Sequence, residues 1–323
     1  MAVIREAEPT SADGALPARI AQLRLRDLLL LEHIAATGAL RQVAERLHVT
    51  QPAITLALRG LEQAFGVQLV ERGRRGVTLT PAGNAALARL RVARRELEQA
   101  HLAARSPAAV PLRIGALPVA ALQVLPRVLP RVVAEHPDLD LVLGEDTVAG
   151  LWDKLASGAF DAIVCRMPSM AQKEGLPPGV IFQAVVEEQL SIVGPAALRA
   201  LRGHPTLQTL AALPWVLPPA QAFTRDEFDQ LFLTHSIPPP EATITSASFH
   251  TNLQLAASCG MLTVVPESAA RRFARTLGLR IVAIPWETPG GSIVLAMRAS
   301  SEALAPLRTL RRCCADLSQT ALP

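Results

Sequence analysis

Gln51, Thr55 and Arg59 are spaced four residues apart, so a helix would place all three on one face. A Gln side chain can form two hydrogen bonds with adenine, and the methyl of Thr can contact the methyl of thymine. An arginine one turn further along reaches a base or, as we favour, a phosphate. This spacing predicts a helix that reads the major groove of duplex DNA; the alternative is a helix face that meets only solvent.

Three arginines follow within the run Glu-Arg-Gly-Arg-Arg-Gly. The planar guanidinium group binds phosphate oxygens, and the two glycines suit a tight turn that projects the arginines outward. We therefore expect Arg72, Arg74 and Arg75 to contact phosphates or the minor groove, with a solvated loop as the alternative. Arg41 is a further candidate for a phosphate contact.

Apolar spacing predicts the elements that position these side chains. Thr50 is expected to cap the helix that carries Gln51, with Pro52 in its first turn, and the unpaired N–H groups there favour a phosphate. Two short helices joined by a tight turn behind a longer one form a helix-turn-helix, and two strands around the arginine run form a wing. The expected helices span residues 25–38, 40–47 and 50–66, and the expected strands span residues 67–70 and 77–79.

A longer helix is expected from Pro81 onward. Six small or apolar residues recur in it about every 3.5 positions, which is typical of a coiled-coil seam. We expect this helix to pair with a second copy of the chain; packing against its own domain is the alternative. The seam consists of Ala86, Leu90, Ala93, Leu97, Ala100 and Ala104.

From residue 112 strands alternate with helices, which predicts an α/β domain of buried parallel strands with crossover helices. About 210 residues is large for one open sheet, so two α/β lobes with a cleft between them are expected. The expected strands span residues 112–117, 139–143, 160–165, 190–193, 215–217, 242–245, 261–265, 279–284 and 292–297. The expected helices span residues 120–135, 148–156, 225–235, 249–258 and 302–317.

The 323-residue chain has a net charge of +4, and its positive excess lies in one segment. Residues 21–105 hold 13 arginines and seven acids, whereas residues 106–323 hold 17 basic and 18 acidic residues. A basic module joined to a near-neutral one is typical of a polyanion-binding protein with a second task. Phe65 is the sole aromatic residue of the basic segment, which favours duplex DNA, because single strands are held by stacking on aromatic rings.

Half of the residues are hydrophobic, which excludes a chain that is disordered throughout. No apolar run approaches the ~18 residues of a membrane-spanning helix, and the charged N-terminus is unlike a secretory signal. We therefore expect a cytoplasmic protein without membrane contact, in which residues 1–21 form a mobile extension.

Motifs of the common enzyme classes are absent from the sequence: it contains no GxSxG, GxxxxGK(S/T) or HExxH motif and no GxGxxG after a strand. The four cysteines are too unevenly spaced for a metal knuckle, and we expect buried, reduced thiols. A redox role for the adjacent Cys313 and Cys314 is the alternative. No catalytic residue, metal or cofactor is expected.

The run AERLHVTQPAIT at residues 44–55, with Leu-Thr-Pro-Ala-Gly at residues 79–83, strongly resembles the LysR-type transcriptional regulators. The resemblance covers residues 23–323 and is strongest in the N-terminal part. Later segments, such as Gly-Ala-Phe-Asp-Ala-Ile at residues 158–163, look like that family's effector-binding domain.

The resemblance implies an α/β protein with an N-terminal all-α winged helix-turn-helix, a long linker helix and a two-lobed, periplasmic-binding-protein-like effector domain. It further implies a homodimer or homotetramer, assembled through the linker helix and the effector domain, that binds double-stranded promoter DNA and a small-molecule effector. The parts are the winged helix at residues 22–80, the linker at 81–105, effector subdomain I at 111–186 with 281–323, and subdomain II at 187–280.

Two places depart from the family's pattern. Leu56 and Ala57 stand where relatives often carry Arg, Lys or Gln, so we expect fewer polar contacts with bases and more dependence on DNA shape. Pro52 and Leu56 remain candidates for DNA contact. In the effector domain, Val119 and Ala120 follow the first strand where relatives often present a Ser or Thr, which argues against a hydroxyl contact with a carboxylate there.

Strand ends and helix N-termini at the lobe junction are the expected effector site, because unpaired N–H groups there attract anions. Arg166 is expected to follow a strand and to balance a carboxylate. The full set of effector candidates is Val119, Ala120, Arg166, Ser246, Ser248 and Phe249.

The leading hypothesis is a DNA-binding regulator whose dimer geometry changes when an effector binds. The alternative is a solute-binding protein or small-molecule enzyme whose basic module only mediates oligomerisation.

Overall fold

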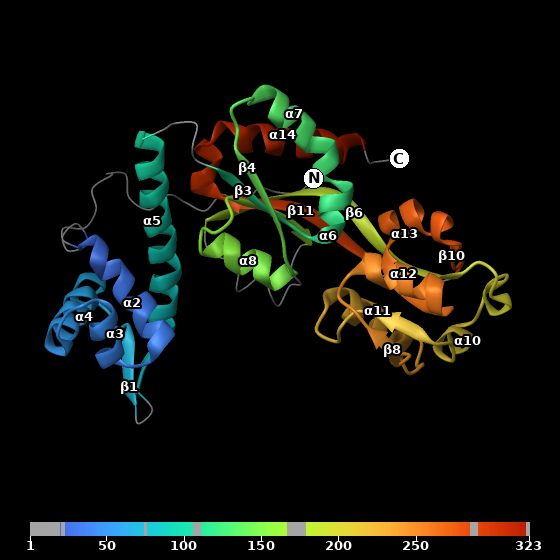
Figure 1. Cartoon of the computed structure of the whole chain (residues 1–323), viewed down its shortest axis with the longest axis horizontal. Helices are drawn as coiled ribbons and strands as arrows, with labels where there is room; N and C mark the ends of the chain where they lie inside the picture. Colours follow the sequence, from blue (N-terminus) through green and yellow to red (C-terminus); the bar gives the residue numbers. More distant parts are fainter. Residues whose placement is uncertain are drawn as a thin grey trace. The chain divides into compact units, whose positions relative to one another are not determined.

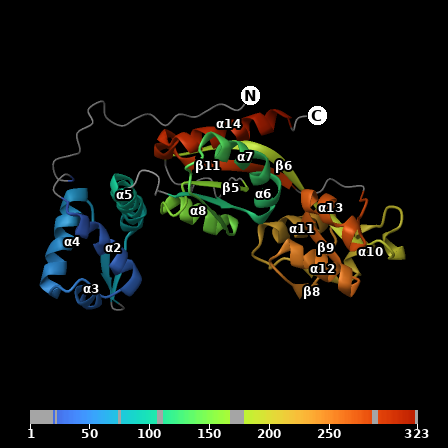
Figure 2. The ribbon, with the colours of Figure 1, turned by 45° about the horizontal axis from the view of Figure 1, so that its top comes forward.

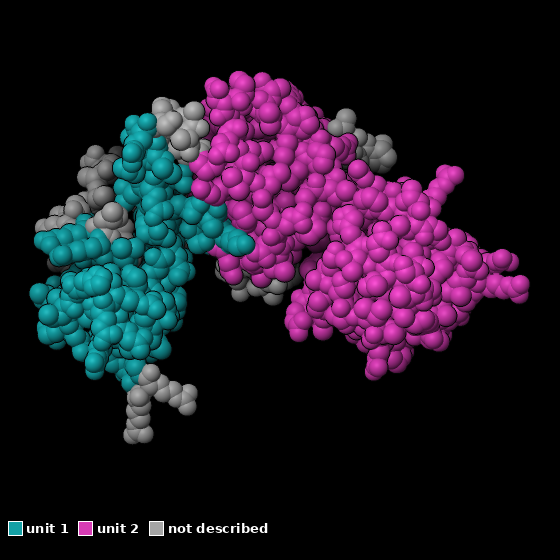
Figure 3. Space-filling view, in the orientation of Figure 1, with its two compact units in different colours: residues 1–110, 154–159 teal, residues 111–153, 160–323 magenta. Residues whose placement is uncertain are grey.

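The computed structural model describes residues 20, 23–73, 76–105, 111–166, 179–284 and 290–320. The chain divides into two compact units, residues 1–110 with 154–159 (unit 1) and residues 111–153 with 160–323 (unit 2) (Figure 3). Within the described ranges, no helix is both long enough and apolar enough to cross a membrane.

Three helices surround the core of unit 1 (Figure 1): α2 (Leu25–Thr37), α3 (Leu40–Arg46) and α4 (Gln51–Phe65). Helices α2 and α4 end where Gly38 and Gly66 adopt the left-handed conformation that glycine tolerates best. Leu31, Val43 and Leu61 are fully enclosed between the helices. The helix-turn-helix expected from the sequence is confirmed.

Two short antiparallel strands, β1 (Val70–Gly73) and β2 (Gly76–Leu79), follow α4 and form the wing. The first strand begins three residues later than expected. Glu62 gives the reason, because its carboxylate accepts the N–H of Leu69 at 2.9 Å and that of Val70 at 3.3 Å. The Glu62 side chain of α4 thereby binds the backbone at the entry to the wing, and the strand begins only at Val70.

Helix α5 (Pro81–Arg105) divides its expected seam between two environments. Leu87 and Leu90 are buried in the core of unit 1, so the first turns pack against their own domain. Further along, the seam residue Leu97 is 51% exposed, and the seam residues Ala93 and Ala100 are exposed as well. The seam expected to face a second copy is therefore available from Ala93 onward, whereas Leu90 is already occupied within its own unit.

Unit 2 contains a mixed nine-stranded sheet in two parts. We call the part ordered β4-β3-β5-β11-β6 lobe I, and the part ordered β6-β9-β7-β8, in which β10 also pairs with β6, lobe II. The strands are β3 (Leu112–Ala116), β4 (Leu141–Glu145), β5 (Ala162–Arg166), β6 (Val180–Pro195), β7 (Trp215–Leu217), β8 (Ala242–Thr245), β9 (Leu262–Pro266), β10 (Leu279–Ile281) and β11 (Gly290–Arg298).

The expectation of parallel strands holds at the outer parts of the sheet and is wrong at its centre. Strand β3 runs parallel to β4 and β5, and β7 runs parallel to β8 and β9. Strand β11 is antiparallel to both β5 and β6. The reason is that the chain enters lobe II along β6 and returns to lobe I along β11, so these two neighbours must run in opposite directions.

Strand β6 is 16 residues long and belongs to both lobes. It pairs with β11 as far as Gln189 and with β9 from Leu190. The sequence predicted only residues 190–193 as a strand. Residues 180–186 are largely apolar, but the polar run Glu187-Glu188-Gln189 separates them from residues 190–193 and resembles a break between two elements.

Helices cover the sheet of each lobe. Figure 2 shows α7 and α14 side by side on one face of lobe I, with α8 on the other. One helix was expected over residues 120–135, but two form, because the helix breaks at Val124 and Pro126 starts the second. The helices are α6 (Pro118–Gln123), α7 (Leu125–Glu135), α8 (Val148–Ala156), α10 (Leu207–Ala211), α11 (Phe223–Thr234), α12 (Phe249–Cys259), α13 (Glu267–Phe273) and α14 (Ala305–Thr320).

The cysteines only partly match their expected burial. Cys165, Cys313 and Cys314 are buried in lobe I, whereas Cys259 is exposed at the end of α12. Burial raises the pKa of the Cys165 and Cys314 thiols to about 12. Cys313 and Cys314 lie in the packed terminal helix, which favours a structural role for the pair over a redox role.

Candidate DNA interface and effector site

The residues expected to read DNA lie at the start of α4. Thr50 caps this helix, its hydroxyl accepting the N–H of Ala53 at 3.4 Å. Gln51 and Pro52 are exposed beside it, opposite the buried face of the helix. The hydroxyl of Thr55 donates to the carbonyl of Gln51 at 3.2 Å, so the methyl is the group that remains for an outside contact.

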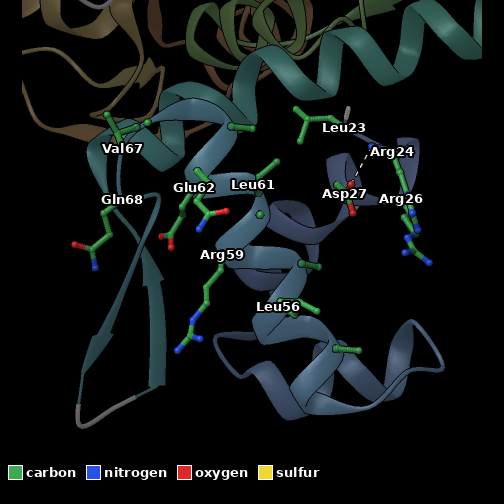
Figure 4. Close-up of a pocket in the computed structure, with 16 residues that line it drawn as sticks. Leu23, Arg24, Arg26, Asp27, Leu56, Arg59, Leu61, Glu62, Val67 and Gln68 are labelled. Carbon is green, nitrogen blue, oxygen red and sulfur yellow. Dashed lines mark hydrogen bonds between the residues drawn. The ribbon is translucent and has the colours of Figure 1, made fainter. Parts of the chain in front are cut away.

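A broad hollow opens on the same unit between α4 and the segment that leads into α2 (Figure 4). Leu56 and Arg59 of α4 line it, and both are exposed. Arg24 and Arg26 line its other side, also exposed. These two arginines were not among the sequence candidates, although a pair of cations at the start of an apolar helix was the signal that could have found them.

The expected phosphate contacts of the wing are only partly described. Arg72 is exposed on β1, where its backbone pairs with Val77. Arg74 and Arg75 lie outside the described residues. Arg41 is exposed but forms an ion pair with Glu45 of the same helix, 3.2 Å apart, so part of its charge is already balanced.

In lobe I, the side chains of Val119 and Ala120 do not face a ligand. Both are buried in the hydrophobic core of this lobe, at 5% and 0% exposure. Contact with a ligand at these positions is therefore limited to the backbone at the start of α6.

Arg166 is the last residue of β5, not a residue beyond the strand as expected. Its side chain is only 4% exposed; its Nη2 donates to the carbonyl of Glu188 at 3.4 Å, and its guanidinium carbon lies 5.1 Å from the centre of the Phe223 ring. Burial lowers the pKa of Arg166, while the nearby carboxylates of Glu188 and Glu227 oppose that shift. Nη1 is buried without a hydrogen-bond partner among the described residues.

Glu188 is the acidic neighbour of Arg166 and was missed by sequence reasoning. Its side chain is 2% exposed, and its Oε1 accepts the N–H of Ser268 at 2.9 Å. Burial raises its pKa, and the hydrogen bonds from Ser268 only partly offset this. Arg166 and Glu188 are 22 residues apart and meet only through the pairing of β5, β11 and β6, so no local pattern points to them.

The candidates of lobe II cluster before α12. Ser248 caps this helix, its hydroxyl accepting the N–H of Thr251 at 3.3 Å, and the hydroxyl of Ser246 accepts the N–H of Ser248 at 3.4 Å. The ring of Phe249 stacks on His250 with centroids 4.1 Å apart. These residues are thus brought together with one another, while Arg166 packs instead against Phe223.

Two family models match the chain. Residues 25–84 match the model described as a bacterial regulatory helix-turn-helix protein of the lysR family. Residues 105–319 match the model described as the LysR substrate binding domain.

The chain is also similar to curated proteins and solved structures. It is 32% identical to a probable hydrogen peroxide-inducible genes activator of Streptomyces viridosporus, over 83% of this chain and 88% of that protein. It is 28% identical to the transcriptional regulator GbpR of Azospirillum brasilense, over 81% and 77%. A structure of an OxyR mutant of Corynebacterium glutamicum with hydrogen peroxide bound matches 93% of this chain and 94% of that chain, with 27% identity and a TM-score of 0.55.

Proposed function

The chain belongs to the LysR family of bacterial transcriptional regulators, and we propose that it binds promoter DNA through α4 and the wing and answers to a small molecule bound in unit 2. It is a DNA-binding regulator with an effector domain, and not an enzyme. The finer assignments that follow are ours.

The exposed face of α4 carries the DNA proposal. Gln51 is exposed at the capped start of the helix, where Pro52 has no N–H and the N–H of Ala53 is bonded to Thr50, so the backbone N–H of Gln51 is the one at this helix start that favours a phosphate. Arg59, further along α4, and Arg72, on the wing, are exposed as well, and they supply positive charge for the flanking phosphates. We assign base contact to Gln51, Pro52, Thr55 and Leu56, and phosphate contact to Arg41, Thr50, Arg59, Arg72, Arg74 and Arg75.

We further propose that the chain works as a homodimer or homotetramer paired through α5 and unit 2. Support comes from the second half of that helix, where Leu97 of the expected seam is 51% exposed and the seam residues Ala93, Ala100 and Ala104 are exposed with it. An exposed apolar stripe on a long helix is stabilised when a second helix covers it. Because its target is chromosomal DNA, we place the protein in the cytoplasm.

For the effector we propose a site in unit 2 where lobe I and lobe II meet, with the residues 111–186 and 281–323 as one subdomain and 187–280 as the other. The change of partners along β6 after Gln189 supports this division. Arg166 is the favoured effector contact, because a buried guanidinium N–H without a partner gains a hydrogen bond from a ligand. Ser246, Ser248 and Phe249 are proposed from lobe II, and Val119 and Ala120 through their backbone.

The DNA proposal is tested with the full chain and the intergenic duplex upstream of its own gene, by fluorescence anisotropy at several salt concentrations. Arg72→Ala should lower the slope of log affinity against log salt by about 1, because one phosphate contact is lost. Gln51→Ala should weaken specific binding by about 1–3 kcal/mol. Arg202→Ala, at an exposed arginine of unit 2, is the matched control and should change neither.

The outcome that contradicts the proposal is equally clear. If wild-type protein shows no salt-sensitive binding to this duplex, or if Gln51→Ala and Arg72→Ala bind as the control does, then α4 and the wing are not the DNA interface.

A further inference from the structure

Leu56 is the most exposed large apolar residue among the side chains that the structure describes, at 71% exposure. It projects from α4 into the hollow of unit 1 (Figure 4). Leaving a leucine in water loses the free energy that burial of its side chain would supply. An exposed leucine in the middle of a DNA-reading helix therefore points to a partner that covers it when DNA is bound.

The surroundings of Leu56 on α4 are small and smooth. Ala53, Ala57 and Gly60 line the same hollow, and a Cβ added at Gly60 would meet no atom of the described residues within 4 Å. Leu56 thus stands clear of its neighbours on an open helix surface. Among the described residues, the side chains next to Leu56 on this face are small, so a flat partner such as the floor of the major groove can approach it closely.

The charges around this face identify the chemistry of the partner. Arg59 on α4 and Arg24 and Arg26 at the start of α2 flank Leu56, and all three are exposed (Figure 4). The two acids of the hollow are already engaged, since Asp27 accepts the backbone N–H of Arg24 at 2.9 Å and Glu62 accepts those of the wing entry. An apolar centre between cations suits a polyanion that carries apolar groups.

In duplex DNA, the thymine C5-methyl is the apolar group presented in the major groove, with phosphates on either side. Leu56 is exposed on the helix that carries Gln51, directly after Thr55 in the sequence and one turn from Arg59. We propose that Leu56 contacts the C5-methyl of a thymine and makes operator recognition depend on that methyl. This inference rests on the proposed function, in that α4 must lie in the major groove.

The test replaces thymine in the DNA by deoxyuridine, which differs from it only in lacking the C5-methyl. The region of the upstream intergenic duplex that the wild-type chain protects is first located by footprinting, and each thymine in it is then replaced singly by deoxyuridine. Wild-type protein should bind about fourfold more weakly at one thymine in each half-site, the effect expected for one CH₂-sized group left in water. Leu56→Ala should bind the deoxyuridine and thymine duplexes equally at that position.

Two further variants test whether the dependence on the methyl is due to Leu56 alone. Leu233→Ala, at a leucine that is 52% exposed in unit 2, should keep the full methyl dependence. Thr55→Ser removes the neighbouring methyl and should also keep the dependence at the thymine assigned to Leu56. Alanine is the best helix former, so Leu56→Ala is expected to fold normally.

Each contrary result overturns the inference in a recognisable way. Equal binding of all deoxyuridine duplexes by the wild type means that no methyl is read, and loss of the dependence in Thr55→Ser, with retention in Leu56→Ala, moves the contact to Thr55. A change in molecular mass of Leu56→Ala means that a second copy covers the leucine. If the wild-type protein does not bind the unmodified duplex, the proposed DNA-binding function is wrong, and the inference about Leu56 is wrong with it.

Discussion

Single residues show most directly how burial controls chemistry in this protein. Glu188 is enclosed in the strand shared by the two lobes, next to Arg166 and under the N–H of Ser268. Burial raises its pKa, so the folded state favours the protonated carboxyl more than the unfolded state does. Ionised Glu188 therefore lowers the free energy of unfolding at neutral pH.

We expect Glu188→Gln to stabilise the protein in a pH-dependent manner. Below about pH 4 both side chains are neutral and the two proteins should melt alike. As the pH rises through the raised pKa, wild type loses stability that the amide keeps, so the difference in Tm should grow in favour of the variant up to neutral pH. Each kcal/mol corresponds to about 2–4 °C for a domain of this size. Thermal melts at pH 4, 5, 6 and 7 check this, and a difference that shrinks with rising pH would contradict it.

The cysteines provide a second residue-scale prediction. Thiolates and not thiols react with disulfide reagents, and burial raises the pKa of Cys165 and Cys314 to about 12. Cys313 is also buried, and burial raises its pKa too. Native protein at pH 7.5 should therefore titrate one thiol per chain with a chromogenic disulfide, and unfolded protein all four. Cys259→Ser should lower the native value to zero; a fast second thiol in that variant would show that a buried cysteine is accessible.

At the scale of elements, the junction between α5 and the chain entering the wing leaves no room for a side chain at Gly83. Gly83 lies in the first turn of α5, where its N–H donates to the hydroxyl of Thr80 at 2.9 Å. A Cβ on Gly83 would lie 2.0 Å from the backbone carbonyl oxygen of Leu69. That carbonyl also accepts the N–H of Thr80, so it cannot move away without breaking a hydrogen bond.

We expect Gly83→Ala to destabilise unit 1 by at least about 2 kcal/mol, because overpacking against backbone forces the elements apart. Gly60→Ala is the matched control, since the same methyl on α4 meets open space and alanine is favoured over glycine in a helix by about 1 kcal/mol. Urea unfolding gives the free energy of unfolding of both variants and of the wild type. If the two substitutions change the free energy of unfolding equally, then Gly83 of α5 does not lie as close to the carbonyl of Leu69 as described.

Elements were predictable from the sequence to the extent that local signals define them. Helix α4 carries its own cap at Thr50 and its own stop at Gly66, and the structure places both there. Strand β6 was largely missed because its partners β11 and β9 come later in the chain, and because the polar residues Glu187, Glu188 and Gln189 interrupt its apolar sequence at the lobe junction.

The candidate site follows the same rule. The face of α4 was predictable because 3.6-residue spacing alone places Gln51, Thr55 and Arg59 together. Arg166 and Glu188 were not predictable as a pair, because their contact depends on the order of strands in the finished sheet. Val119 and Ala120 were assigned to a ligand from their place after a strand, yet tertiary packing buries their side chains in the core.

For the whole molecule, the main test concerns pairing of two chains through α5. Leu97→Arg should shift the protein toward monomer in analytical ultracentrifugation, because a cation would replace an apolar side chain in the proposed seam. Affinity for a two-half-site duplex should fall at least about tenfold, since a monomer loses the gain of linked binding. Leu233→Arg, at a similarly exposed leucine of unit 2, serves as the control. An unchanged mass with Leu97→Arg would exclude the second half of α5 from the interface.

The continuity of β6 through both sheets has a mechanical consequence for unit 2. A strand whose first part is bonded to β11 and whose last part is bonded to β9 cannot let the lobes separate as two free bodies. Relative motion of the lobes must instead twist the backbone of β6 where its partners change, together with the chain that returns from β10 to β11. A molecule that displaces the part of β6 paired with β11 would therefore also rotate the part paired with β9, because both belong to one continuous backbone.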